Sequence, residues 1–168
     1  MKTTNSITRS LVEQSDSQKT PNLWGYRIYN DKSAELYKLF KKENYLRQGW
    51  GYKSEHDLKL NPKDKAVARN KEILKKLKKG DYIVVAHFPS TNKVCIAKAT
   101  EDADKGYVFE QTNIPGCGTE NDFGHMFPAE EICLVEYSTL KDILKCRRRF
   151  WRLNTAPNRI LSIVKGYK

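Results

Sequence analysis

The feature that most constrains the fold is the most apolar run of the chain, residues 81–87, which read Asp-Tyr-Ile-Val-Val-Ala-His. A run of this kind is typical of a strand buried at the centre of a sheet. A turn is expected at residues 88–92, and residues 93–100 then return as a second strand containing Val94, Ile96 and Ala97. The run therefore predicts a sheet built around these two strands.

Shorter elements are expected on both sides of that pair. Alternation of apolar and other residues over 23–29 predicts a first strand. Apolar residues at helical spacing over 33–44 predict a short amphipathic helix, and residues 45–52 follow as a second strand or an extended loop. The remaining expected elements, in chain order, are a lysine-rich helix at 62–79, a strand at 107–111, a loop at 113–121, a pair of strands within 123–137 and a helix at 138–146.

Strands outnumber the helices that could cross over between them, so a doubly wound parallel sheet does not fit this pattern. The sequence instead predicts an α+β fold, a small mixed barrel-like sheet with flanking helices. Three regions are expected: a flexible polar tail at 1–22, one domain at 23–153, and a basic C-terminal extension at 154–168. This extension could be the truncated start of a longer segment.

Charge is spread unevenly along the 168 residues, whose net charge is +11. Residues 32–79 hold 15 Lys/Arg against 6 Asp/Glu, residues 80–140 hold 3 against 10, and residues 141–168 hold 9 against 1. If the two basic segments meet in space, they form a surface that attracts phosphates. The alternative is a lysine-rich solvated surface that binds nothing. The Arg-Arg-Arg-Phe-Trp-Arg stretch at 147–152 favours the phosphate hypothesis, because guanidinium groups form bidentate hydrogen bonds with phosphates and stack on aromatic rings.

Location and cofactors are constrained by what the sequence lacks. No apolar run reaches membrane-spanning length, and the N-terminus has no signal-peptide region, so we expect a cytoplasmic protein with no membrane partner. The four cysteines, Cys95, Cys117, Cys133 and Cys146, form no CxxC pair and are expected to be free thiols. No cofactor or metal is expected, because Cys117, His125 and Cys133 lack the spacing of a structural zinc site.

The strongest candidate for binding is Trp50, which lies between Gly49 and Gly51. Small neighbours leave an indole face open, and such a ring is a platform for stacking a nucleobase. The alternative is a core tryptophan on a glycine-rich strand. Other aromatic residues near glycines, turns or arginines could complete a base-binding pocket: Tyr52, Phe88, Phe123, Trp24 and Trp151. The candidate phosphate contacts are Arg47, Lys53, Arg147, Arg148, Arg149 and Arg152.

Catalysis has one candidate pair, Asp122 and His125, which supply a carboxylate and an imidazole close together. No nucleophile motif accompanies them, so a structural histidine in a turn is the favoured interpretation. We therefore expect a binding protein and not an enzyme. Two alternatives stay open: a catalytic domain that uses Asp122 and His125 on nucleic acid, and a basic module that binds an acidic protein.

The order of these motifs resembles the PUA-like superfamily, and within it the EVE and YTH readers of modified bases. Trp50, in Arg-Gln-Gly-Trp-Gly-Tyr, has the place of a tryptophan that forms one cage wall in YTH domains. Residues 84–97 match the apolar strand, aromatic turn and returning strand, and residues 124–130 match the strand that follows. The closing helix and basic stretch match residues 138–151. The resemblance covers about residues 23–153.

This resemblance implies a module that binds DNA or RNA and captures a flipped, modified base in an aromatic pocket. The second cage tryptophan of YTH domains would fall near Glu130, where this chain has no aromatic residue. That departure favours the EVE-like branch, whose members resemble readers fused to nucleases in modification-dependent restriction. The resemblance then implies a fused or associated nuclease, and a second pocket wall from Phe88, Phe123 or Trp151.

Overall fold

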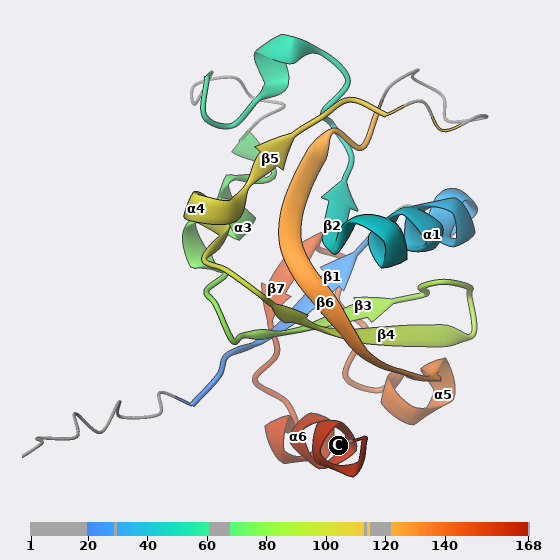
Figure 1. Cartoon of the computed structure of the whole chain (residues 1–168). Coiled ribbons are helices and arrows are strands. Elements are labelled where there is room, and N and C mark those ends of the chain that lie inside the picture. Colours follow the sequence, from blue (N-terminus) through green and yellow to red (C-terminus); the bar gives the residue numbers. More distant parts are fainter. Residues whose placement is uncertain (1–19, 29, 61–67, 113, 115–121, 168) are drawn as a thin grey trace, which may run out of the picture.

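A computed structural model describes residues 20–28, 30–60, 68–112, 114 and 122–167. These residues form an α+β fold around a seven-stranded mixed sheet that curls into a half-barrel (Figure 1). The strands are β1 (Leu23–Arg27), β2 (Tyr45–Gln48), β3 (Tyr82–Ala86), β4 (Lys93–Ala99), β5 (Val108–Phe109), β6 (His125–Glu136) and β7 (Phe150–Arg152). The helices are α1 (Ser33–Glu43), α3 (Lys71–Lys76), α4 (Ala103–Gly106), α5 (Tyr137–Leu140) and α6 (Pro157–Gly166), with short 3-10 turns η1 (Asn30–Lys32) and η2 (Ser54–His56).

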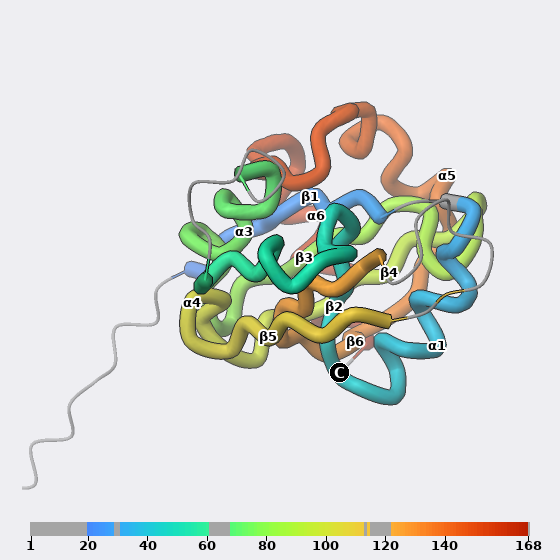
Figure 2. The backbone as a smooth tube through the Cα atoms, turned by 90° about the horizontal axis from the view of Figure 1, so that it is seen from above, coloured from blue at the N-terminus to red at the C-terminus, as the bar shows by residue number. Residues whose placement is uncertain are grey.

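The sheet has the order β2-β6-β4-β3-β1-β7, and β5 pairs with β6 on the edge opposite β2. Only β1 and β3 run parallel among the described strands, and every other described pair is antiparallel. From above, α3 and α4 lie on one side of the molecule, and α1 and α5 lie on the other (Figure 2). The mixed sheet and the flanking helices confirm the fold class predicted from the sequence.

The long strand β6 joins the two halves of the half-barrel. Its first residues pair with β2 and β5, up to Pro128 opposite Tyr45, and its later residues pair with β4 from Ala129 opposite Ala99. Proline has no N–H to donate, so Pro128 suits the point where one partner strand gives way to the next. The sequence prediction of two strands within 123–137 was therefore wrong, because the chain continues extended where a turn was expected.

Both faces of β3 are buried, as the apolar run predicted. Ile83 and Val85 belong to the core cluster inside the curled sheet, whereas Val84 and Ala86 belong to a second cluster on the other face. Successive side chains of a strand point to opposite faces, so one apolar run serves two cores. A strand of this kind can occupy only the interior of a sheet that is covered on both sides.

The C-terminal segment is part of this domain, which corrects the predicted extension at 154–168. Helix α6 covers the second face of the sheet and places Ile160 and Val164 in the second core cluster. Arg159 on the same helix forms an ion pair with Asp142 at 2.9 Å. Two apolar residues four positions apart lie on one helix face, and this spacing is the local signal that the sequence interpretation passed over.

Other expectations were met in part. The helix expected at 138–146 is a single turn at α5. Helix α3 lies in the second half of the helix expected at 62–79, of which residues 62–67 lie outside the described part. Most of the tail at 1–22, most of the loop at 113–121, and Cys117 also lie outside it. Cys95, Cys133 and Cys146 are free thiols. Within the described residues, no helix is both long and apolar enough to cross a membrane.

Candidate functional site

The loop that follows β2 holds Trp50 in an unusual backbone conformation. Trp50 has a φ of +71°, a left-handed value that is uncommon for residues other than glycine. The carbonyl before it is fixed by Asn70, whose Nδ2 donates to the Gly49 oxygen at 2.9 Å. The Trp50 carbonyl itself accepts from His125 Nε2 at 3.2 Å. Conformations of this kind persist where surrounding contacts impose them, so these bonds fix the direction of the indole.

The far side of the loop is held against residues 122–124. The Asp122 carboxylate accepts from the backbone N–H groups of Gly51 at 3.1 Å and of Phe123 at 2.7 Å. The Gly51 carbonyl accepts from the Gly124 N–H at 3.1 Å. A Cβ atom at Gly124 would collide with that carbonyl oxygen, so only glycine allows the two backbones to lie this close. The loop is therefore fixed on both sides before any ligand binds.

The indole ring of Trp50 is partly exposed and faces two arginines. The guanidinium carbon of Arg69 lies 4.0 Å from the ring centroid, and that of Arg149 lies 5.4 Å away. Both distances are within the range of a cation–π contact. In the described part of the chain, neither guanidinium forms an ion pair with a carboxylate. We call these three residues the Trp50–arginine cluster.

The electrostatics of this cluster favour an added negative charge. Burial, and then the neighbouring Arg69 charge, lower the pKa of the Arg149 guanidinium from its ordinary value. Within the described residues, Arg149 Nη1 reaches the Gly49 carbonyl at the long distance of 3.5 Å. Two cations that share one ring repel each other, and a phosphate between them would relieve that repulsion. The cluster thus combines a stacking surface with two charges of one sign that form no ion pair among the described residues.

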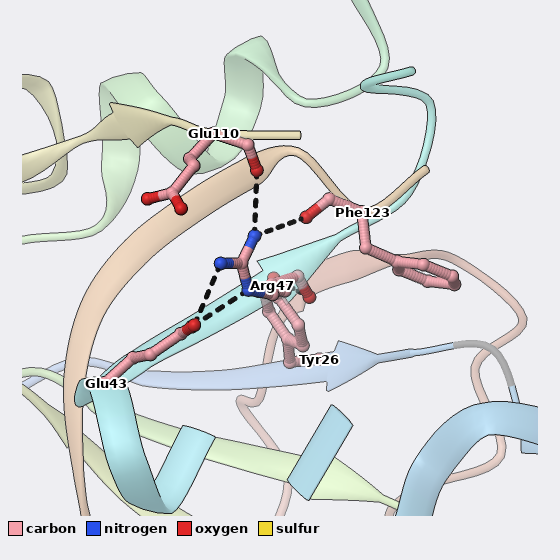
Figure 3. A network of polar contacts seen from close by, with 5 residues as sticks. All are labelled: Tyr26, Glu43, Arg47, Glu110 and Phe123. Atoms are coloured by element: carbon pink, nitrogen blue, oxygen red, sulfur yellow. Dashed lines mark hydrogen bonds and ion pairs between the residues drawn. The ribbon is translucent and has the colours of Figure 1, made fainter. Parts of the chain in front are cut away.

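Arg47 does not serve the role that the sequence suggested for it. Its side chain is only 2% exposed, and Glu43 binds it through two contacts at 2.9 and 3.0 Å (Figure 3). Its Nη1 donates to the carbonyls of Glu110 at 2.9 Å and Phe123 at 3.2 Å. No donor nitrogen of Arg47 is left for a phosphate. The predicted phosphate contact was wrong, because this guanidinium fastens β2 to the end of α1 and to the segments after β5 and before β6.

Asp122 and His125 do not form an acid–base pair either. The Asp122 carboxylate binds backbone N–H groups, as described above, and His125 is fully buried. Burial lowers the pKa of His125 to about 4, so its imidazole is neutral at neutral pH. Its Nδ1 lies 2.9 Å from the Tyr107 hydroxyl, and its Nε2 holds the Trp50 carbonyl. Both ring nitrogens are occupied, and this arrangement suits support of the loop rather than proton transfer.

Three of the aromatic residues predicted to bind a base lie in the core. Phe88 is 0% exposed and packs against Phe40 at a centroid distance of 6.1 Å. Trp24 is 6% exposed and donates its Nε1 to Asp81 at 2.8 Å. Phe123 is 4% exposed beside Gly49. The hypothesis that these rings line an open pocket was wrong, because neighbouring elements already cover them.

The other predicted residues stay accessible. Tyr52 is partly exposed, with Lys53 Nζ 5.8 Å from its ring, and both follow Trp50 in the chain. Trp151 is partly exposed and covers Gly25, where a Cβ atom would collide with the indole. Trp151 therefore supports β1 and faces a groove with its remaining surface.

That groove, of about 780 Å³, lies along β7 and shows that the two basic segments meet. Its lining residues come from the start of β1, from α3 and from the segment around β7: Trp24, Glu72, Lys76, Cys146, Arg148, Phe150, Trp151, Arg152 and Asn154. Arg147 and Arg148 are exposed, and the Arg152 guanidinium lies 5.2 Å from the Trp24 ring. Of the predicted cations at 147–152, Arg148 and Arg152 thus line the same groove as Lys76.

The sequence interpretation missed Arg69 and Asn70. One signal was present, because Arg69 is the lone arginine within the lysine-rich segment 53–79. No group of three potential metal ligands occurs in the described residues. A scan against protein-family models and a search of curated proteins both return no match to this chain.

Proposed function

We propose that this protein is a nucleic-acid-binding module that stacks one base on Trp50 and binds the adjoining phosphates through arginines. The observation that carries this proposal is the Trp50–arginine cluster, a partly exposed indole that faces two guanidinium groups without carboxylate partners among the described residues. An aromatic platform next to uncompensated cations matches the two chemical parts of a nucleotide. The curled mixed sheet supports the finer proposal of a PUA-like, EVE-like reader domain.

Binding is proposed to exchange one stacked group for another. Arg69 is exposed and lies in the turn before α3, so its side chain can leave the ring of Trp50. A base then takes the place of the guanidinium on the indole, and Arg69 turns to the phosphate. Stacking of one base contributes about 1–3 kcal/mol. Because His125 and Asn70 already fix the loop, the ring needs no reordering, and this preorganisation lowers the cost of binding.

The remaining cations extend the contact to the rest of the strand. Four further cations are exposed and can bind phosphate oxygens of DNA or RNA: Arg147, Arg148, Arg152 and Lys53. We propose that the captured base carries a modification and that the module serves as the reader of a modification-dependent restriction system, with a fused or associated nuclease. The domain itself is proposed to bind without turnover.

The test is a binding screen with labelled oligonucleotides, single- and double-stranded, that carry modified or unmodified bases. Trp50→Ala is expected to weaken binding by about 1–3 kcal/mol, the value of one stacked base, with the greatest loss for the preferred base. Its free energy of unfolding is expected to fall by less than the roughly 3–5 kcal/mol typical of a buried tryptophan. Tyr167→Ala is the control, because Tyr167 is an aromatic residue that is 60% exposed directly after α6.

Two results would contradict the proposal. One is the absence of oligonucleotide binding by the wild-type chain at low salt. The other is a Trp50→Ala variant that is strongly destabilised but keeps the affinity and base preference of the wild type. In the second case Trp50 would be a core residue, and the basic surface would act alone.

A further inference from the structure

Three buried side-chain atoms in the described part of the chain have no hydrogen-bond partner: Arg27 Nε, His56 Nδ1 and Asn70 Oδ1. All three residues contact the segment 48–52, which contains Trp50. An unpaired buried polar atom is costly, so a group of them around one loop calls for an explanation. A ligand that enters this loop with polar groups of its own would supply one.

Asn70 has the best-defined free atom of the three. Its side chain is 0% exposed, and its Nδ2 donates to the Gly49 carbonyl at 2.9 Å. That bond fixes the orientation of the amide, because the opposite orientation would place two oxygens together. The oxygen Oδ1 is therefore the atom without a partner, and it can only accept a hydrogen bond.

The usual role for an asparagine at this position does not apply. Asn70 immediately precedes α3, where an asparagine side chain ordinarily accepts from a backbone N–H of the first turn. Asn70 makes no such side-chain bond, and the N–H groups of Ile73 and Leu74 bind its main-chain carbonyl at 3.1 and 3.3 Å. The free oxygen thus has no part in holding the helix.

The position of Asn70 relates it to the proposed base site. Its chain neighbour Arg69 lies over the Trp50 ring, and its amide binds the residue that precedes Trp50. A base that replaces Arg69 on the indole would therefore arrive beside the Asn70 amide. The edge of such a base carries hydrogen-bonding groups that differ between bases.

We propose that Asn70 Oδ1 accepts a hydrogen bond from the exocyclic amino group of the base stacked on Trp50. This inference rests on the proposed function and adds the class of base. Adenine and cytosine carry an amino group where hypoxanthine and uracil carry a carbonyl. A carbonyl would set two acceptors against each other and leave both unpaired, so the amino bases bind more tightly.

The experiment uses nine-nucleotide single strands in which one base stands among abasic positions. Adenine is compared with hypoxanthine, and cytosine with uracil. The wild-type chain is expected to bind the amino member of each pair at least about tenfold more tightly. Asn70→Leu keeps a similar volume but has no acceptor, and its ratio is expected to fall to about one. The matched control Asn158→Leu, in the exposed first turn of α6, is expected to keep the wild-type ratio.

A wild-type ratio of about one in both pairs overturns the inference without any variant. An Asn70→Leu variant that loses affinity equally for both members of a pair also overturns it, because a merely structural asparagine would have that effect. If Trp50→Ala still removes binding in either case, the proposed function stands and only the role of Asn70 fails. If Trp50→Ala changes nothing, the proposed function itself fails.

Discussion

Arg47 lies on the strand that leads into the Trp50 loop, and Arg149 lies against that loop, yet the two arginines have opposite surroundings. Arg47 is 2% exposed and contacts one carboxylate and two carbonyls with its three nitrogens. Arg149 approaches a carbonyl only at 3.5 Å and otherwise faces the Trp50 ring and a second arginine. A guanidinium whose three nitrogens all donate to neighbouring residues holds segments together. A guanidinium left without a carboxylate beside a partly exposed ring has capacity for a ligand.

The difference comes from the elements that reach each side of the loop. Helix α1 ends next to β2, so Glu43, four residues before Arg47, can cover the guanidinium from its own segment. On the other side, the turn before α3 and the segment before β7 bring Arg69 and Arg149 to the ring, and neither forms an ion pair with a described carboxylate. Among the described residues, an ion pair with Glu43 distinguishes Arg47 from Arg69 and Arg149, which form no such pair in the proposed binding site.

The largest effect that can break this comparison is expected for Arg47→Ala. It leaves the Glu43 carboxylate and two carbonyls without their donor, and loss of one member of a buried pair costs about 3–5 kcal/mol. Urea unfolding of the variant measures this. Arg159→Ala, which breaks an exposed pair with Asp142, is the control and should change stability little. A small loss in Arg47→Ala would show that the network of Figure 3 is not what holds β2.

An intermediate effect concerns the support beneath Trp50. The pKa of His125 falls from its ordinary 6.5 to about 4 in the folded chain, so between these values the unfolded chain binds more protons. The free energy of unfolding should therefore decrease as the pH falls from 6.5 to about 4, by at most about 3 kcal/mol from this residue. Unfolding curves across that pH range measure the decrease.

His125→Gln lacks this titration, so its stability should depend less steeply on pH over the same range. His87→Gln is the matched control, because His87 lies in the turn after β3 and is partly exposed. Equal pH dependence in the wild type and in His125→Gln would contradict a buried, neutral imidazole under the loop.

The smallest effect on stability is expected for Arg69→Ala, which sharpens the contrast with Arg47. An exposed cation–π contact contributes about 0.5–1 kcal/mol, so unfolding should change by less than about 1 kcal/mol. The slope of log affinity for oligonucleotides against log salt concentration should become shallower by about one released counterion. Lys165→Ala, with the same change of charge at the end of α6, should leave that dependence unaltered. If Arg69→Ala lowers the free energy of unfolding as much as Arg47→Ala does, Arg69 is a structural residue and not part of the proposed binding site.

Local pattern was enough to predict several elements. The strands expected at 23–29, 81–87 and 93–100 correspond to β1, β3 and β4, and the helix expected at 33–44 corresponds to α1. Alternation and helical spacing are properties of neighbouring residues, so they can be recognised without the fold. The continuous strand β6 could not be recognised in this way, because three partner strands from distant parts of the chain keep it extended.

The candidate site divides along the same line. The sequence by itself determined that Trp50 stands between two glycines, that Arg149 lies in a basic aromatic stretch, and that two segments carry the positive charge. Only the tertiary structure decided that Arg69 and Asn70 join Trp50, that Arg47 is buried against Glu43, and that the Phe88 and Trp24 rings are covered. Exposure and hydrogen-bond partners depend on which distant elements pack over a side chain, and no local pattern of residues specifies that.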